Sequence, residues 1–351
     1  MVKYCNEFSC SAFTNVSLLL GLTAIERIPL LFGYKDWFAN VHLLVPQKEC
    51  EECQCLLSRA NAERVSCYCR DDFRDNTDHT SIALAIENVV AMDGVRGVLF
   101  QHFDFWLNVR QFQDAPLDAI WTLDNGTLYY PNTPYCVPVG RYWSRSFPPH
   151  IKAWAGNTCG QETPLFLPAV RTDRVSWPKL RLRYCCWGWS DAFYLPSEYI
   201  SAFSRLSVAL NDTFLEVAVP TIVSMMEQHA DATRFHVRCP RAATCCRQLV
   251  RSNYEPWSSE LCGHKLGLDK PQYRAMLRRT LMTNWSRANE INNADEKFFR
   301  KRLGETGTRY PYGKPMPKGW DNRTRRCTEG PELEGVWIEP RPGIMSDVPV
   351  G

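Results

Sequence analysis

Sixteen cysteines in a chain of 351 residues constrain this sequence more than any other feature. Several lie in tight groups, which are Cys50, Cys53 and Cys55, then Cys67 and Cys69, then the adjacent Cys185 and Cys186, and finally Cys239, Cys245 and Cys246. In an oxidising compartment this density is typical of a disulfide framework, whereas in a reducing cytosol it is typical of metal sites. A second indication of the compartment is therefore needed to choose between disulfides and metal sites.

That second sign is the Asn-x-Ser/Thr triplet, which begins at Asn15, Asn125, Asn211, Asn284 and Asn322. Only a chain that enters the lumen of the secretory pathway can be glycosylated at such triplets. The two signals agree, so we expect a disulfide-bonded glycoprotein of the ER or Golgi lumen, or a secreted one.

A zinc site is the alternative interpretation of the first cysteine group. Cys50, Cys53, Cys67 and Cys69 together supply four thiolates, although Cys67 and Cys69 are closer in sequence than zinc-binding pairs usually are. A zinc-stabilised intracellular protein would have free thiols and unmodified asparagines.

No membrane anchor is predicted within the chain. The best apolar run, residues 16–25, is short, contains Thr23 and lacks a basic flank or a small-residue cleavage site. We expect the anchor of a lumenal protein to precede residue 1.

The composition points to a large globular protein. A hydrophobic content of 45% and an aromatic content of 12% are enough to bury a substantial core. With 41 basic and 38 acidic residues the net charge is only +3, which gives no reason to expect nucleic acid as the main partner.

Helical and strand patterns alternate along the first 230 residues, which predicts an α/β fold with a largely parallel sheet. Helices are expected over residues 24–32, 81–92 (closed by Gly94), 196–210 and 214–229 (with Pro220 inside), and strands over residues 40–46, 97–103 and 184–195 (interrupted at Gly188). Residues 48–75 are predicted to be a disulfide-stapled loop, and residues 114–178 to be long ordered loops with short strands and a tight turn at 124–126.

We divide the chain into three parts. Residues 1–270 are expected to form the main domain, residues 271–303 a peripheral basic helical segment, and residues 304–351 a poorly ordered tail rich in Pro and Gly.

The most informative candidate site follows the strand predicted at residues 97–103. Ligands of parallel sheets bind at the carboxyl ends of strands, and Asp104 lies at such an end, next to His102 and Trp106. A carboxylate there is suited to hold a divalent cation on a diphosphate, although an Asp at a strand end is also a common turn or cap residue.

The sequence Gly97-Val-Leu-Phe-Gln-His-Phe-Asp-Phe-Trp-Leu-Asn108 resembles the strand and acidic metal-binding turn of GT-A-type glycosyltransferases. Two later blocks, residues 187–196 and 214–221, resemble poorly characterised exostosin-like eukaryotic proteins. The resemblance covers residues 2–269 and implies a GT-A-like, Rossmann-like mixed sheet flanked by helices, with long disulfide-stapled loops. His102 stands where the usual motif has its first aspartate.

The resemblance also implies roles for individual residues. Asp104 and His102 would bind a divalent metal, Mn²⁺, and the diphosphate of a nucleoside-diphosphate sugar, with His264 as a further metal ligand. Asp191 would contact the donor sugar or the acceptor, Glu216 would be the general base of an inverting enzyme, and Trp106, Trp187 and Trp189 would contact the sugars.

These residues also have structural interpretations that stay open. Glu216 fits the first turn of a helix, Asp191 fits a cap for the helix near Pro196, His264 fits a structural residue beside a disulfide, and the tryptophans fit a core. The function predicted is transfer of a sugar to a glycan or glycoprotein hydroxyl, and the alternative is an inactive carbohydrate-binding relative. A hydrolase using Asp104, Asp191 and Glu216 is a further alternative.

Overall fold

The structure is a computed structural model that describes part of the chain. It describes residues 13–21, 31–59, 64–71, 78–103, 105–123, 136–140, 156–160, 166–167, 170–171, 176–177, 180–237, 262–263, 277 and 281. Asp104, His264, the expected 124–126 turn and nearly all of the expected 24–32 helix lie outside these residues. Within the described residues, no helix is both long and apolar enough to span a membrane.

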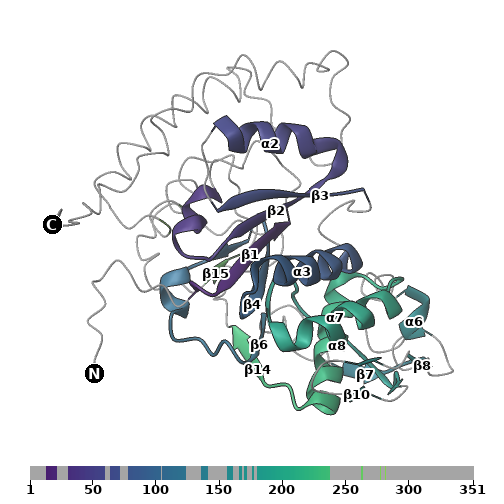
Figure 1. Cartoon of the computed structure of the whole chain (residues 1–351). Coiled ribbons are helices and arrows are strands. Elements are labelled where there is room, and N and C mark those ends of the chain that lie inside the picture. The colour runs from purple at the N-terminus through teal and green to yellow at the C-terminus, as the bar shows by residue number, and fades with distance from the viewer. Residues whose placement is uncertain are drawn as a thin grey trace, which may run out of the picture.

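A mixed, seven-stranded sheet forms the centre of the molecule, with the strand order β14-β6-β13-β4-β1-β2-β3 (Figure 1). All neighbouring strands pair in parallel except β13, which is antiparallel to both β4 and β6. The strands are β1 (Val16–Gly21), β2 (Val41–Pro46), β3 (Val65–Arg70), β4 (Gly97–His102), β6 (Ile120–Leu123), β13 (Ala192–Pro196) and β14 (Arg234–Val237). This sheet confirms the predicted α/β class with a mixed, largely parallel sheet flanked by helices.

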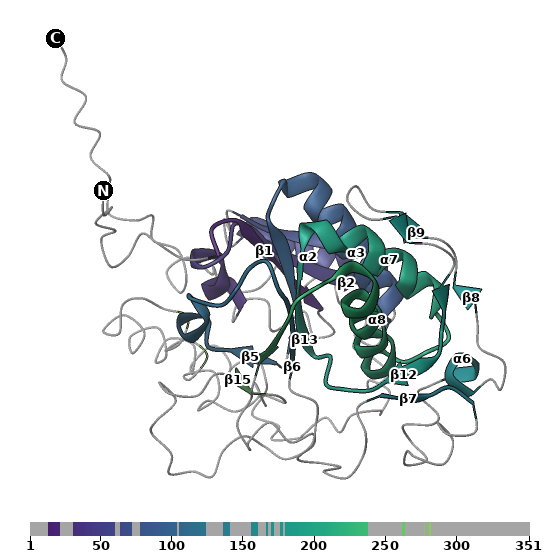
Figure 2. The ribbon, with the colours of Figure 1, turned by 90° about the horizontal axis from the view of Figure 1, so that it is seen from below.

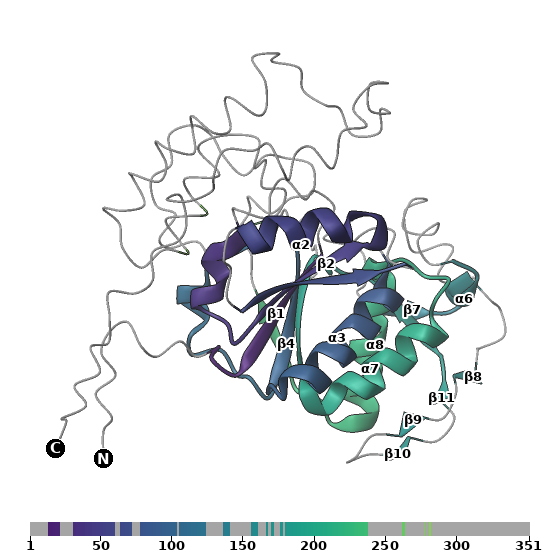
Figure 3. The same cartoon turned by 45° about the horizontal axis from the view of Figure 1, so that its top comes forward.

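Helices cover both faces of the sheet. α3 (His79–Asp93), α7 (Ser197–Ala209) and α8 (Leu215–Ala230) cover one face, and α2 (Cys50–Arg59) lies on the other (Figure 3). Short elements complete the described chain: η2 (Phe32–Asp36), η3 (Gln47–Glu49), η4 (Val109–Phe112), α6 (Gly156–Gly160), β5 (Trp106–Leu107), β7 (Cys136–Pro138), β8 (Phe166–Leu167), β9 (Val170–Arg171), β10 (Ser176–Trp177), β11 (Leu180–Arg181), β12 (Tyr184–Cys186) and β15 (Cys262–Gly263).

Alternate residues of each central strand enter two separate cores, because side chains of a strand alternate between the faces of its sheet. Leu18 and Leu20 pack on the α2 face with Trp37 and Phe38, whereas Leu19 packs on the α3 face with the three helices there. Burial on both faces explains why the strands read as continuous apolar runs in the sequence.

Most predicted elements are confirmed. Gly94 ends α3 in the left-handed conformation with φ 61°, and its backbone N–H donates to the Val90 carbonyl, as a glycine C-cap does. α7 begins directly after Pro196, and the 184–195 region is a strand pair, β12 and β13, interrupted around Gly188 as expected.

The prediction for residues 48–75 is right about the disulfides but wrong about the secondary structure. This segment contains α2 and the edge strand β3 rather than a loop. Disulfides Cys50–Cys69 and Cys53–Cys67 join the helix to the strand, so the zinc alternative for these four cysteines is also wrong. The helix and strand patterns were not recognised in the sequence, because cysteines occupy the apolar positions through which α2 packs on β3.

Two more disulfides join distant parts of the α3 side of the molecule. Cys136–Cys186 links β7 to β12, and Cys159–Cys185 links α6 to β12. α6, β7 and β12 accordingly lie side by side (Figure 2). Four disulfides of this kind are typical of a chain that folds in an oxidising compartment.

A polar network lies at the amino ends of β1 to β3. Asp93 Oδ2 accepts hydrogen bonds from Ser17 Oγ at 2.5 Å and from His42 Nε2 at 2.7 Å, and His42 Nδ1 bonds Ser66 Oγ at 2.8 Å. Burial alone would raise the pKa of Asp93, but the bonds from Ser17 and His42 outweigh burial and lower it. The network fixes the end of α3 on the sheet.

Two residues of the expected peripheral segment are part of the core. Leu277 and Leu281 are buried on the α2 face, where the Leu281 carbonyl accepts a hydrogen bond from Trp37 Nε1 at 2.8 Å. The three-part division of the chain stays a prediction, but these two leucines belong to the core of the sheet.

Candidate functional site

The candidate site lies where β1 and β4 end and β13 begins. Gly21 and His102 are the last residues of β1 and β4 and are partners in the parallel register. Because β13 runs the other way, its first residue, Ala192, lies at the same edge, opposite Gln101. The antiparallel strand therefore brings the residue before it, Asp191, beside the residue that ends β4.

His102 and Asp191 form a buried pair across this edge. His102 Nδ1 lies 3.0 Å from Asp191 Oδ1, and the backbone N–H of His102 donates to the Asp191 carbonyl at 2.8 Å. Only 10% of the His102 side chain and 5% of the Asp191 side chain are exposed. These two bonds, one from the backbone and one from the ring, hold His102 against Asp191.

The chain turns immediately after His102. The backbone N–H of Phe105 donates to the His102 carbonyl at 3.1 Å, which closes a turn that begins at His102. Gln101 supports this turn from the α2 face, because its Nε2 donates to the Phe105 carbonyl at 2.8 Å and to the Tyr34 hydroxyl at 3.0 Å. Burial raises the pKa of Tyr34 to about 12, so its hydroxyl stays protonated.

Sequence reasoning missed Gln101. The available signal was a single amide inside an otherwise apolar strand, since a buried polar side chain in such a place needs hydrogen-bonding partners.

The loop that carries Trp187 and Trp189 is fixed on α8. The backbone N–H of Gly188 donates to the Glu216 carbonyl at 2.9 Å. That carbonyl is available because Pro220, four residues on, has no N–H to donate to it. One turn later, Thr221 Oγ1 accepts from the Cys186 N–H at 2.8 Å. These two bonds hold the start of α8, which carries Glu216, next to the loop that contains the tryptophans and leads into Asp191.

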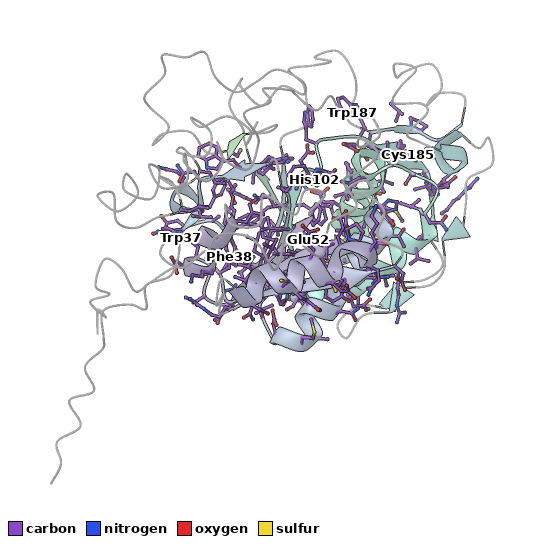
Figure 4. The ribbon with its side chains drawn as sticks, turned by 90° about the horizontal axis from the view of Figure 1, so that it is seen from above. Trp37, Phe38, Glu52, His102, Cys185 and Trp187 are labelled. Carbon is purple, nitrogen blue, oxygen red and sulfur yellow. A yellow bond between two sulfur atoms is a disulfide. The ribbon has the colours of Figure 1, made fainter. Side chains whose placement is uncertain are left out.

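The three candidate tryptophans differ in exposure. Trp106 is fully buried, Trp187 is 6% exposed and packs in the α3-side core, and Trp189 is half-buried. Figure 4 shows Trp187 and Cys185 on the side of the molecule away from Trp37 and Phe38. Of the three rings, Trp189 has the most surface available for stacking on a sugar.

The candidate residues nearer the carboxyl end of the chain are placed only in part. β15 pairs antiparallel with β5, and Gly263 lies opposite Trp106. Residues 262–263, which precede His264 in the sequence, therefore lie beside the segment that follows the 102–105 turn. Cys262 is disulfide-bonded and buried.

Asp191 does not cap α7. The N-cap of that helix is Pro196, and no side chain bonds the first turn there. Glu216 does lie in the first turn of α8, where a carboxylate interacts favourably with the helix dipole, so its structural interpretation is confirmed and its catalytic role stays a prediction.

Among the described residues, no cluster of three or more His, Cys, Asp or Glu side chains could hold a metal ion. Asp104 and His264 lie outside those residues. His102 has the arrangement of a metal-ligating histidine, whose second ring nitrogen is bonded to a carboxylate. The ligands that the resemblance implies, His102, Asp104 and His264, are two imidazoles and one carboxylate, and a carboxylate is a ligand that Mn²⁺ accepts.

No protein-family model matches this chain. No curated protein matches it either. Among solved structures, a glycosyltransferase involved in the glycosylation of the major capsid of PBCV-1 is 9% identical, with 75% of this chain and 98% of that chain covered and a TM-score of 0.28. Mannose-1-phosphate geranyltransferase from Thermus thermophilus is 10% identical, with 64% and 74% covered and a TM-score of 0.27. At these TM-scores neither similarity carries an argument, so the functional case rests on the geometry.

Proposed function

We propose that this protein is a glycosyltransferase that moves a sugar from a nucleoside-diphosphate sugar to a hydroxyl of a glycan or glycoprotein. The observation that carries the proposal is the buried His102–Asp191 pair at the edge where the parallel strands β1 and β4 end. This edge is where ligands bind in parallel sheets, and a fixed imidazole with a carboxylate behind it is suited to a charged ligand.

Asp191 holds the His102 ring in one orientation in this proposal. Its Oδ1 accepts a hydrogen bond from Nδ1–H, so the tautomer that carries its proton on Nδ1 is favoured. His102, Asp104 and His264 are the residues proposed to hold the cation. When bound, a divalent cation would neutralise the charge that develops on the leaving diphosphate.

Glu216 is proposed to accept the proton of the acceptor hydroxyl. Its carbonyl accepts a hydrogen bond from Gly188, so the first turn of α8 lies beside the tryptophan loop, and its side chain is half-buried. Trp189 is proposed to stack on a sugar ring and to exclude water from it. The base would activate the acceptor hydroxyl in an inverting transfer, and the ring would help to hold the sugar.

The proposed compartment is the ER or Golgi lumen, or the secreted fraction. The four disulfides between described residues support it. The exostosin-like resemblance stays a prediction.

A thermal-shift screen of nucleoside-diphosphate sugars with and without Mn²⁺ tests the proposal. We expect one donor to raise Tm only when Mn²⁺ is present, and Asp104→Ala to abolish that shift. Asp114→Ala, which removes an exposed carboxylate elsewhere, is the matched control and should keep it.

Two results would argue against the transferase. If free oligosaccharides raised Tm and no nucleotide sugar did so, the result would support the inactive carbohydrate-binding relative instead. A metal-dependent shift that survives Asp104→Ala would remove Asp104 from the site.

A further inference from the structure

The turn between α7 and α8 exposes one asparagine in a segment whose other residues are engaged. Leu210 is fully buried, and Thr213 Oγ1 donates to the Leu210 carbonyl at 2.7 Å. The Asp212 carboxylate accepts from the Thr158 N–H at 3.0 Å and from its hydroxyl, which joins the turn to α6. Asn211 lies between these residues, and it is exposed.

The fold gives no structural reason for an asparagine at position 211. Its φ is not positive, since Arg64 and Asp231 are the described non-glycine residues with that conformation. It caps neither helix, because the C-cap of α7 is Leu210 and the N-cap of α8 is Phe214. No hydrogen bond between described residues involves its side chain.

Asn211 is also the first residue of an Asn-Asp-Thr triplet, and the chain's disulfides are typical of the compartment where such triplets are modified. We propose that Asn211 carries an N-linked glycan.

The chemistry is transfer of an oligosaccharide from a lipid-linked pyrophosphate donor. The Asn211 Nδ2 forms a bond to the anomeric carbon of the sugar, the bond from that carbon to the pyrophosphate oxygen breaks, and the pyrophosphate leaves with the electron pair. The amide proton passes to a base of the transferring enzyme. Because the side chain is exposed and its neighbours hold the turn, the glycan extends into solvent without disturbing a packed residue.

The test is glycopeptide mass spectrometry on the full chain, expressed behind a cleavable secretion leader in a eukaryotic cell. The peptide that contains Asn211 should carry glycan in the wild-type protein, and treatment with an asparagine-specific glycosidase in heavy-oxygen water should convert Asn211 into labelled Asp. Asn211→Gln should remove this one glycan and leave the glycan state of the Asn15 peptide unchanged.

Thr213→Ser and Thr213→Val separate the modification from the packing of the turn. The serine variant keeps the hydroxyl and should keep the glycan, whereas the valine variant should lose it. Recovery of the wild-type Asn211 peptide only in unmodified form would overturn the proposal, whatever the behaviour of the variants.

Discussion

The backbone N–H of Gly188 donates to the carbonyl of Glu216 at 2.9 Å, and a proline makes this bond possible. In a regular helix the residue at position 220 would occupy that carbonyl, but Pro220 has no N–H. A helix-disfavouring residue thus anchors the loop that carries both tryptophans and leads into Asp191.

Replacing this proline tests the anchor. Pro220→Ala supplies an N–H that competes for the Glu216 carbonyl, so we expect faster hydrogen exchange at the Gly188 amide and weaker donor binding, together with a helix more stable by up to about 3 kcal/mol. Hydrogen exchange with mass spectrometry and calorimetric titration measure the two effects. Unchanged exchange at Gly188 would show that the loop is held by other contacts.

The disulfides of β12 should matter for binding as well as for stability. We expect Cys159→Ser/Cys185→Ser to lower stability by about 3 kcal/mol and to weaken donor binding, because the pair holds the strand that precedes the tryptophan loop. The control is Cys53→Ser/Cys67→Ser, which removes a disulfide between α2 and β3. It should lower Tm but leave donor affinity unchanged.

Asp191→Asn should weaken Mn²⁺ binding about 10- to 100-fold, because residues that orient a metal ligand have effects of this size. Paramagnetic resonance of Mn²⁺ measures the affinity without any assay of transfer. Asp93→Asn is the matched control, since Asp93 bonds His42 at the opposite edge of the sheet. Both variants should lose stability, and equal Mn²⁺ affinity in the two would contradict the role given to Asp191.

The free energy of unfolding should decrease in mild acid, because His79 is buried and its pKa is lowered. This buried histidine bonds the Ser207 carbonyl, and burial lowers its pKa below the ordinary 6.5. As the pH falls below 6.5 the unfolded chain takes up this proton first, so the folded state loses up to about 1.4 kcal/mol per pH unit. His79→Gln keeps a donor for Ser207 and should flatten the curve of Tm against pH in this range. An unchanged curve would exclude His79 as its source.

The two loop tryptophans should separate into a binding residue and a core residue. Trp189→Ala should weaken donor or acceptor binding by about 1–2 kcal/mol with little change in Tm, because its ring is half-buried. Trp187→Ala should instead lower stability by about 3–5 kcal/mol, because its ring is 6% exposed. Titration and thermal unfolding of both variants distinguish the roles, and a stable Trp187→Ala protein with lost binding would reverse them.

The sequence predicted those helices and strands whose ends or burial depend on neighbouring residues in the chain. The apolar run before Gly94 and the strand ending at His102 are examples, because a glycine cap and two-sided burial leave clear marks in a sequence. The α2–β3 unit was missed, since cysteines occupy the positions where aliphatic residues would have shown the pattern.

The contact between His102 and Asp191 could not be predicted from the sequence. His102 and Asp191 meet only because β13 is inserted antiparallel between β4 and β6, and strand direction is a property of the whole sheet. Pro220 made it foreseeable that the Glu216 carbonyl would bond outside its own helix, but its partner, Gly188, was not foreseeable.

Trp37 and Leu281 meet although 244 positions separate them in the chain. During synthesis the indole N–H of Trp37 is therefore made long before the carbonyl that will accept its hydrogen bond. This corner of the α2-side core stays incomplete until residue 281 has left the ribosome, so the final packing there comes after the sheet has been translated.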